Sequence, residues 1–528
     1  MVEAREEEEE EKVKEEEEEE EKKKEGGVVV VVDAPREEEA QGEEASTIIS
    51  RLQAQRPLDP IHITSPPPPT PSSVQPILST PPEGTSIGIA SLNSRAYTNK
   101  ISLFLFLLHL LVAIAAVSFF CFKGVEGLLE SGTWRARRER KVLKFWLPPI
   151  EGSAVLSIFL AFIWQKAVRT WPFFMVGFIL WACFFSTMAA GILLLCFSLP
   201  ATSGAGVALI LFSIGTGLYA CWSTRRTPFT ARVFAKSLAP VCKFQALNGP
   251  AYLMLGAGFL WISLWCFAII GALNFYYPPL TIIALVLSLA WTAEVMRNVA
   301  NLTVSRVIAL YYLRGMQCNV QFSFQRALSL NLGSACLGSL FLPTIEALRI
   351  VARALNLLEG EDEFMFSCAH CCLHVMDSIF RIGNSWAFVH IAAYGRGFVA
   401  ASKSTWGMFE AQRMEVLVDS DITSAVCFLT GVTSGSLCVI FAASWTFSAH
   451  KHYTATVSLL AFFVGYLMTR IGMALPQACV ACYYVCYAEN PTSRLFDSTI
   501  PDRLSQINSG RDPLVPTPRF PRRLFTPT

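Results

Sequence analysis

The sequence predicts an all-α, polytopic membrane protein with about ten transmembrane helices and a disordered N-terminal tail. Two observations carry this prediction. Hydrophobic residues make up 52% of the 528 positions, and apolar runs recur from residue 101 onward at roughly the 20-residue length that spans a bilayer. The residues before that point are polar and repetitive, with runs of Glu and Lys followed by a proline cluster.

Composition divides the chain into three parts. Residues 1–98 are expected to form a disordered, acidic and Pro-rich cytosolic tail, because dense charge and few aromatic residues leave no core to fold around. Residues 99–489 form the predicted transmembrane domain, and residues 490–528 a cytosolic C-terminal tail. The 16 cysteines are scattered, which argues against a secreted disulfide framework. No signal peptide is recognised, so the first apolar run is expected to act as the insertion signal.

The ten expected spans follow from the apolar runs and their boundaries. The third run has Pro172 in its first turn, where proline is well tolerated. The seventh is rich in small residues that permit close helix contact. The eighth carries several charged residues and fits either a polar-lined span or an interfacial amphipathic hairpin. The expected spans are 101–122, 150–164, 173–198, 204–222, 250–273, 280–312, 328–350, 364–402, 422–448 and 455–487.

Basic residues predict the orientation of the domain. Five Lys and Arg residues between positions 225 and 243 place that loop in the cytosol, and the uncharged turns near Pro200 and Tyr277 outside. Both termini are then cytosolic. The basic stretch 135–144 contradicts this scheme, because the same count of spans places it outside.

The most informative stretch is residues 280–315, where an apolar run continues into Trp291, Glu294, Arg297 and Asn301. A charged side chain at the centre of the membrane costs about 2.5 to 3.5 kcal/mol, so these groups are expected to face a protein interior or a water-filled cavity. A helix over residues 280–312 would measure about 50 Å against a hydrocarbon core of about 30 Å. It must therefore tilt, break or emerge from the membrane.

Three segments together resemble the choline transporter-like family, with its plant and fungal branch nearest. They are WTAEVMRNVANLTVSRVIALYYLRG (291–315), NSWAFVHIAAYGRGFVAASKSTW (384–406) and CYYVCYAENPTSRLF (482–496). The resemblance implies about ten spans, cytosolic termini and movement of choline or related quaternary amines. It does not cover the acidic tail or the proline-rich linker.

A quaternary ammonium cannot donate a hydrogen bond, so its site needs aromatic faces and a carboxylate, each face contributing about 0.5 to 2 kcal/mol. Helical spacing places candidate groups of this kind on the fifth and sixth spans. Glu294 is the candidate counter-charge. The alternatives are that the tryptophans pack or anchor the helices and that Glu294 forms a structural pair with Arg297. The candidate substrate-binding residues are Tyr252, Trp261, Trp265, Trp291, Glu294, Asn298 and Asn301.

Other motifs have plainer explanations. The cluster CAHCCLH at 368–374 lacks a second ligand pair for zinc, so palmitoylation or buried thiols are favoured there and for the cysteines at 479, 482 and 486. His390 could relay protons in a proton-coupled carrier, or simply pack with a hydrogen bond. Asn301 opens a glycosylation sequon that lies in a membrane helix. The pair Asp419 and Asp421 imitates a glycosyltransferase metal motif, but capping of the following helix explains it better.

The functional prediction is a non-enzymatic transporter of choline or a similar organic cation that works by alternating access, as a uniporter or by proton-coupled exchange. No cofactor, metal or nucleic acid is expected. The predicted location is the plasma membrane, with a Golgi-type membrane as the alternative. The competing function is a non-transporting membrane scaffold whose tails bind cytosolic proteins in vesicle traffic or lipid homeostasis. Glu294→Gln should abolish uptake at unchanged abundance in a transporter, whereas a scaffold should tolerate it.

Overall fold

The apolar runs fold into long helices, and the described residues contain no β-strand. The computed structural model describes residues 96–129, 134–272, 277–358, 375, 378–379, 381–449 and 451–509. The predicted acidic tail and the end of the C-terminal tail lie outside these residues, as does the CAHCCLH cluster. The all-α membrane architecture predicted from the sequence is confirmed.

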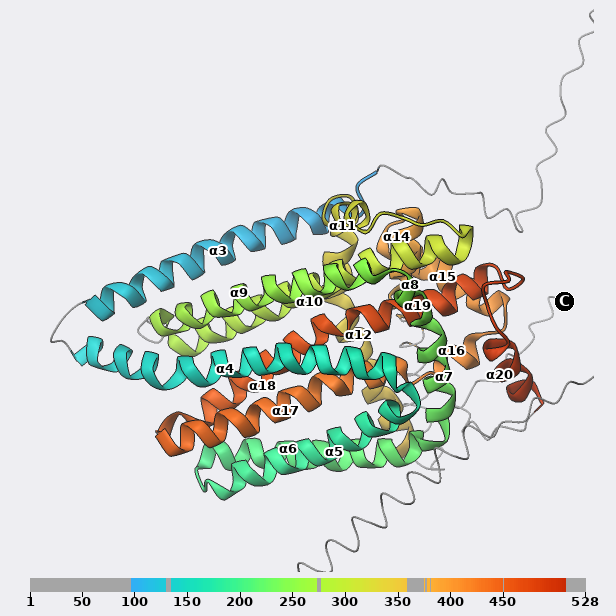
Figure 1. The fold of residues 1–528 in the computed structure, drawn as a ribbon. Helices are drawn as coiled ribbons and strands as arrows, with labels where there is room; N and C mark the ends of the chain where they lie inside the picture. The colour runs from blue at the N-terminus through green and yellow to red at the C-terminus, as the bar shows by residue number, and fades with distance from the viewer. Residues whose placement is uncertain are drawn as a thin grey trace, which may run out of the picture. The chain divides into compact units, whose positions relative to one another are not determined.

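The helices are given with the labels of Figure 1. Their bounds are α3 (Lys100–Leu129), α4 (Trp134–Thr170), α5 (Pro172–Cys196), α6 (Pro200–Ser223), α7 (Thr227–Ser237), α8 (Ala239–Lys243), α9 (Asn248–Ala272), α10 (Pro278–Arg314), α11 (Val320–Leu328), α12 (Leu332–Leu358), α14 (Ala387–Tyr394), α15 (Phe398–Ala411), α16 (Glu415–Ser420), α17 (Thr423–Ala449), α18 (Thr454–Gly472), α19 (Ala474–Glu489) and α20 (Thr499–Asn508). Three short 3₁₀ helices, Thr224–Arg226, Gln245–Leu247 and Lys451–Tyr453, connect some of them.

Eight helical segments in the described residues are long and apolar enough to cross a membrane. A ninth is added if the bent pair Val320–Leu328 and Leu332–Leu348, which meet at 68°, counts as one span. This number is close to the predicted ten.

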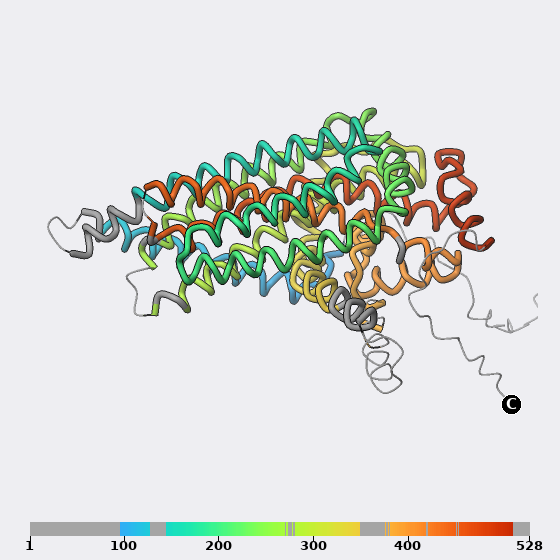
Figure 2. The backbone as a smooth tube through the Cα atoms, turned by 90° about the horizontal axis from the view of Figure 1, so that it is seen from below, coloured from blue at the N-terminus to red at the C-terminus, as the bar shows by residue number. Residues whose placement is uncertain are grey.

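The long helices lie side by side in both views, and those that follow one another in the chain, such as α5 and α6 or α17 and α18, run antiparallel (Figures 1 and 2). The C-terminal ends of α3, α5, α9 and α17 lie at one end of the bundle, and the short helices α7, α14, α15, α16 and α20 lie at the other (Figure 1). α3 begins at the same end of the bundle as α7 (Figure 1). This is expected if the first residues of the domain and the basic loop 225–243 are on the same side of the membrane. The basic stretch 135–144 is a helical extension of α4 at the first end.

Close backbone contact fixes the pairing of α3 with α9. A Cβ atom on Gly271 would lie 1.9 Å from the carbonyl oxygen of Phe120, so only glycine fits at this crossing. The small residues predicted to form a packing face on α12 also meet neighbours, since a Cβ on Gly338 would lie 2.7 Å from the ring of Phe388. Such contacts are characteristic of helix pairs in membranes.

Two expected spans differ from the structure. The described part of the eighth contains the short helices α14 and α15, separated at Gly395 with φ +67°, which agrees with a hairpin rather than a single span. The tenth divides at Met473 into α18 and α19. Pro476 explains this break, because its ring would clash with the carbonyl four residues earlier and it has no N–H to donate.

Candidate functional site

The candidate site is organised around α10, which is unbroken from Pro278 to Arg314. Prolines occupy its first turn, and Gly315 ends it in the left-handed conformation with φ +64°. The polar groups of its second half are buried: Arg297 is 5% exposed, and Asn298 and Asn301 are each 2% exposed. The expectation that they face the protein interior is confirmed. Of the three options of tilting, breaking or emerging from the membrane, the break does not occur.

Glu294 lies in a buried ionic network. One carboxylate oxygen accepts a short hydrogen bond from Arg297, one turn later on α10, and the other lies 3.9 Å from the guanidinium of Arg470 on α18. Arg297 also donates to the side-chain oxygen of Gln477 on α19, at 3.2 Å. The structural pair offered as an alternative role for Glu294 is therefore present, and its charge is shared between two guanidinium groups.

The two asparagines of α10 make separate hydrogen bonds. The Asn298 amide donates to the hydroxyl of Ser339 on α12 at 2.8 Å. The Asn301 side-chain oxygen accepts from Ser305 at 3.0 Å. Because Asn301 is buried inside α10, its sequon is inaccessible for glycosylation.

Two of the candidate aromatic residues have contacts away from Glu294. The indole N–H of Trp265, 2% exposed, donates to the backbone carbonyl of Leu285 at 2.9 Å, which ties α9 to α10. Tyr252 is 37% exposed, and its ring lies 4.5 Å from that of Phe162. These are packing contacts, as expected under the alternative to a substrate role. That role stays a prediction for both.

Trp291 packs against α3, where its ring centroid lies 4.4 Å from that of His109. His109 in turn hydrogen-bonds Ser288 at 3.0 Å. The indole nitrogens of Trp291 and Trp261 are buried and have no hydrogen-bond partner in the described part of the chain. Unpaired buried donors are uncommon and call for an explanation, such as a bound water or ligand.

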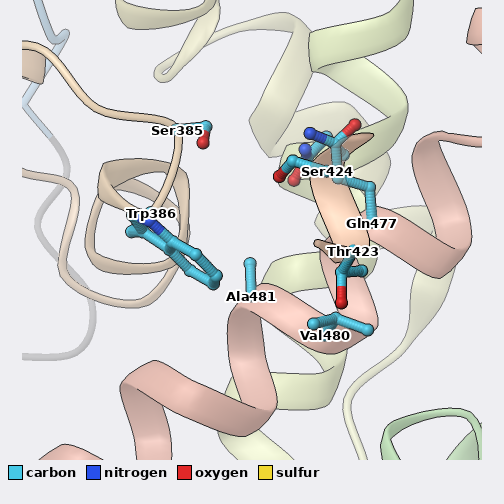
Figure 3. A pocket seen from close by; sticks show the side chains of 8 residues that line it. Ser385, Trp386, Thr423, Ser424, Gln477, Val480 and Ala481 are labelled. Carbon is cyan, nitrogen blue, oxygen red and sulfur yellow. The ribbon is translucent and has the colours of Figure 1, made fainter. Parts of the chain in front are cut away.

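A cavity opens where α10, α14, α17 and α19 meet (Figure 3). It is small, with about 10 Å³ of room, which is near the lower limit for holding one water molecule. Its lining combines hydroxyl groups, two amides and one indole. The lining residues are Asn301, Ser385, Trp386, Thr423, Ser424, Gln477, Val480 and Ala481.

Of the seven predicted site residues, Asn301 alone is among the lining residues of this cavity. Glu294 is connected to it through Arg297 and Gln477. Sequence reasoning did not select Trp386 or Gln477 as site residues. Trp386 lies in a segment that carries the family resemblance, and Gln477 is a lone amide in an apolar run; both are signals that could have identified them.

His390 takes part in a hydrogen-bonded cluster that joins α14, α15 and α19. Its ring lies 3.0 Å from the hydroxyl of Thr405 and 3.7 Å from the carboxylate of Glu489, which also accepts a short hydrogen bond from Tyr394. Burial alone would raise the pKa of Glu489, but hydrogen bonds from His390 and Tyr394 and the nearby charge of Arg396 lower it. The cluster fastens the α14–α15 hairpin to the end of α19.

The cysteines of α19 are buried, with Cys479, Cys482 and Cys486 each 0% exposed. This agrees with buried thiols rather than with acylation sites. Asp421 lies two residues before Thr423, the first residue of α17, and one oxygen of its carboxylate accepts a hydrogen bond from the hydroxyl of Thr423 at 2.7 Å.

Comparison with known proteins places this arrangement in a family. The profile of the family described as "Plasma-membrane choline transporter" matches residues 207–492, more than half of the chain. The chain belongs to the choline transporter-like family. The match begins within α6 and ends just after α19, so it includes α10 and every element that lines the cavity.

Several curated relatives support the assignment. A CTL-like protein of Dictyostelium discoideum is 27% identical over 280 residues, which are 50% of this chain and 50% of the relative. Protein PNS1 of Mycosarcoma maydis is 26% identical over 216 residues, 38% of this chain and 41% of the relative. Protein pns1 of Aspergillus fumigatus is 25% identical over 224 residues, 39% and 42% respectively. The chain spans about half the length of the curated relatives it matches.

Membership of the choline transporter-like family, together with at least eight apolar helices in the described residues, identifies a multi-pass membrane protein. The resemblance noted in three sequence segments is thereby confirmed.

Proposed function

We propose that this protein carries choline or a related quaternary-ammonium solute across the plasma membrane by alternating access. The description of the matched family supports the substrate class and the membrane. The observation that carries the proposal is a buried chain of polar side chains inside the bundle, which connects Arg470 and Glu294 through Arg297 and Gln477 to the cavity.

Burying these charged side chains in the bundle is energetically unfavourable, which suggests that they have a function. Each charged side chain at membrane depth costs about 2.5 to 3.5 kcal/mol on insertion scales, and a bundle that only needs to pack can use apolar residues of similar volume. A polar path between helices gives a hydrophilic solute groups to contact while it crosses. Glu294 and the indoles of Trp261 and Trp291 remain candidates for contact with the substrate along this path.

The test is uptake of radiolabelled choline into liposomes that contain the purified full-length protein, with empty liposomes for background. Uptake should saturate with choline concentration. It should fall in Asn301→Ala, which changes the cavity, and persist in Leu253→Ala, which truncates a side chain on α9 that is 57% exposed.

Absence of uptake from folded protein, measured with and without a pH gradient, would contradict the proposal and favour the scaffold function. The gradient also separates the two coupling modes. At a fixed membrane potential, a uniporter follows the choline gradient alone, whereas a proton-coupled exchanger is also driven by an opposing proton gradient.

A further inference from the structure

We infer that Glu151 of α4 carries the proton in a proton-coupled exchange, in which the cation moves in one direction and a proton in the other. This inference rests on the proposed function, which leaves the choice between uniport and exchange open. It gives a role to a carboxyl group that lies outside the ionic network of α10.

Glu151 is a carboxyl group inside a membrane-spanning segment. It lies in the apolar span Lys144–Thr170, about 10 Å along the helix from Lys144 at about 1.5 Å per residue. One of its oxygens, Oε2, accepts a hydrogen bond from the hydroxyl of Ser263 on α9 at 3.0 Å. The side chain is half-buried, and its other oxygen, Oε1, is buried without a hydrogen-bond partner in the described residues.

No basic group compensates the charge of Glu151 in the described part of the chain, where none of the ion pairs includes it. The polar groups of α9 that face it are the hydroxyl of Ser263 and the thiol of Cys266, which is close enough to interact electrostatically. Neither group is a cation. An ionised Glu151 would therefore be an uncompensated charge in the membrane, which is unfavourable.

The basic groups on the other elements packed near α4 interact with other partners. These pairs are Lys123 with Glu126, His109 with Ser288, Arg470 with Glu294, and Lys451 with the ring of Phe447. On α4 itself, the nearest described basic residues are Lys144 and Lys166, which lie about two and four turns away. The charge of Glu151 is therefore available to a mobile ion.

An exchanger of a proton for a cation needs an acid whose charge no fixed group neutralises. Glu294 does not meet this requirement, because Arg297 hydrogen-bonds one of its oxygens and Arg470 lies 3.9 Å from the other. Its charge is balanced whether or not a substrate is present. Glu151 has only a hydroxyl partner, so a proton or a substrate cation has to balance its charge.

The proton step conserves charge. A proton from water forms an O–H bond with the Glu151 carboxylate and leaves a neutral carboxyl group. On the other side of the membrane that O–H bond breaks, the proton returns to water, and the negative charge of the carboxylate is balanced by the substrate cation within the bundle. A bundle that holds neither ion is unfavourable, which opposes return of the empty carrier and couples the two movements.

Two prolines ahead of Glu151 give the proton a route to it. Pro148 and Pro149 lie inside α4 and have no N–H, so the carbonyl groups of Lys144 and Phe145 lose their helical hydrogen bonds. Ordered water can satisfy such carbonyls in membrane helices. Water there would connect Glu151 to the solution at the end of the bundle where α3 ends (Figure 1).

Helix α9 connects Glu151 to the long helix α10. Ser263, which donates to Glu151, lies two residues before Trp265, whose indole N–H donates to the backbone carbonyl of Leu285 on α10 at 2.9 Å. Hydrogen bonds to an ionised acceptor are stronger than those to a neutral one. Protonation of Glu151 therefore weakens the contact between α4 and α9, and α9 transmits the change to α10.

The experiment measures accumulation of radiolabelled choline in liposomes that contain the purified full-length protein, at a fixed membrane potential and with the interior more acidic by about one pH unit. Exchange of one proton for one cation should give about tenfold accumulation in the wild type. Glu151→Gln resembles the protonated acid and cannot release a proton. This variant should still take up choline down its gradient, but the pH gradient should no longer drive accumulation.

Two further variants are the controls. Glu151→Asp keeps a titratable acid at this position and should retain accumulation. Glu126→Gln is the matched control, because Glu126 is a carboxylate at the same end of the bundle whose side chain is 54% exposed and pairs with Lys123 at 2.7 Å. Its removal should leave accumulation unchanged.

A second measurement on the wild type does not depend on the folding of a variant. Dicyclohexylcarbodiimide is a hydrophobic reagent that reacts with protonated carboxyl groups. Mass spectrometry should find the label at Glu151, should find less of it as the pH is raised, and should find none at Glu294, which two guanidinium groups neutralise. A Glu151 that stays unlabelled at every pH would overturn the inference.

The outcomes separate this inference from the proposed function. Tenfold accumulation in Glu151→Gln would overturn the inference, and so would a wild type that takes up choline without any response to the pH gradient. Both results leave the proposed function intact. A wild type that takes up no choline under any gradient would remove the proposed function and this inference with it.

Discussion

Glu294→Gln is the most informative perturbation of the ionic network, because it removes one charge and keeps the shape of the side chain. The side chains of Arg297, Arg470 and Glu294 are only 6%, 8% and 13% exposed. In the variant both guanidinium groups lose their common carboxylate in a place that water reaches poorly. The amide oxygen of the new glutamine can still accept a hydrogen bond from Arg297.

The magnitude follows from burial. Removing one partner of a buried ion pair typically costs about 3 to 5 kcal/mol, because the remaining charge is uncompensated. A Coulomb energy of about 4 kcal/mol for two unit charges 4 Å apart at an effective dielectric constant of 20 gives the same scale. Removing the guanidinium as well, in the double variant Glu294→Gln/Arg297→Gln, should recover part of this loss.

The assay is thermal unfolding of the detergent-solubilised protein, monitored for the wild type, the two single variants and the double variant. The double variant should be more stable than the sum of the single losses predicts, with a coupling energy of about 0.5 to 3 kcal/mol. A Glu294→Gln protein as stable as the wild type, or strictly additive losses, would refute the reasoning. This measurement also matters for uptake, since loss of transport in Glu294→Gln would otherwise be attributed to substrate binding alone.

Three other predictions concern packing, pH and thiol reactivity. Gly271→Ala should destabilise the α3–α9 contact by about 1 to 3 kcal/mol, because its Cβ would lie 1.9 Å from a backbone oxygen of α3; the melting temperature reports it. Burial would raise the pKa of Asp497, but hydrogen bonds from Tyr483, Thr499 and Lys236 lower it. The contribution of Asp497 to holding α20 is therefore complete above the ordinary pKa of 3.8, and it is lost as the pH falls through the lowered pKa. Hydrogen exchange of α20, corrected for intrinsic rates, should therefore rise only in acid, and at a higher pH in Lys236→Ala. Cys482, buried in α19, should resist a maleimide that labels the exposed Cys242 in the native protein, as mass spectrometry would show.

Each of these predictions has a control and a contrary outcome. Gly215→Ala should be neutral or stabilising, because a Cβ there meets nothing within 4 Å and alanine favours helix; equal behaviour of the two alanine variants would contradict the packing argument. Unchanged acid behaviour in Lys236→Ala would show that the lysine does not influence Asp497. Rapid labelling of Cys482 would contradict its burial.

The burial of the polar side chains in the second half of α10 could be predicted from the sequence, because it follows from the residues of that segment alone. Charged and amide side chains in an apolar run must be satisfied inside the protein, and a single segment shows this without knowledge of its neighbours. Which neighbour satisfies them could not be predicted. Arg470 and Gln477 reach Glu294 and Arg297 from α18 and α19, more than 170 positions along the chain.

The cavity was missed for the same reason. Trp386, Thr423 and Gln477 come from three separated segments, and each has a plain explanation by itself: an interfacial tryptophan, a residue at a helix start and a lone amide. Their convergence depends on how α14, α17 and α19 pack. The break before α19, in contrast, could have been predicted from the sequence, because Pro476 marks it.

The uninterrupted course of α10 limits how this protein can move. At about 1.5 Å per residue, its 37 residues form a rod about 55 Å long. A rod transmits displacement, so a tilt of about 10° around its midpoint would move each end by about 5 Å in opposite directions. Under the proposed alternating access, such a tilt would open one side of the membrane and close the other in one movement. Glu294 and Arg297 would lie near the pivot, and α14, which Arg306 of α10 contacts through the carbonyl of Ala392, would move with one end.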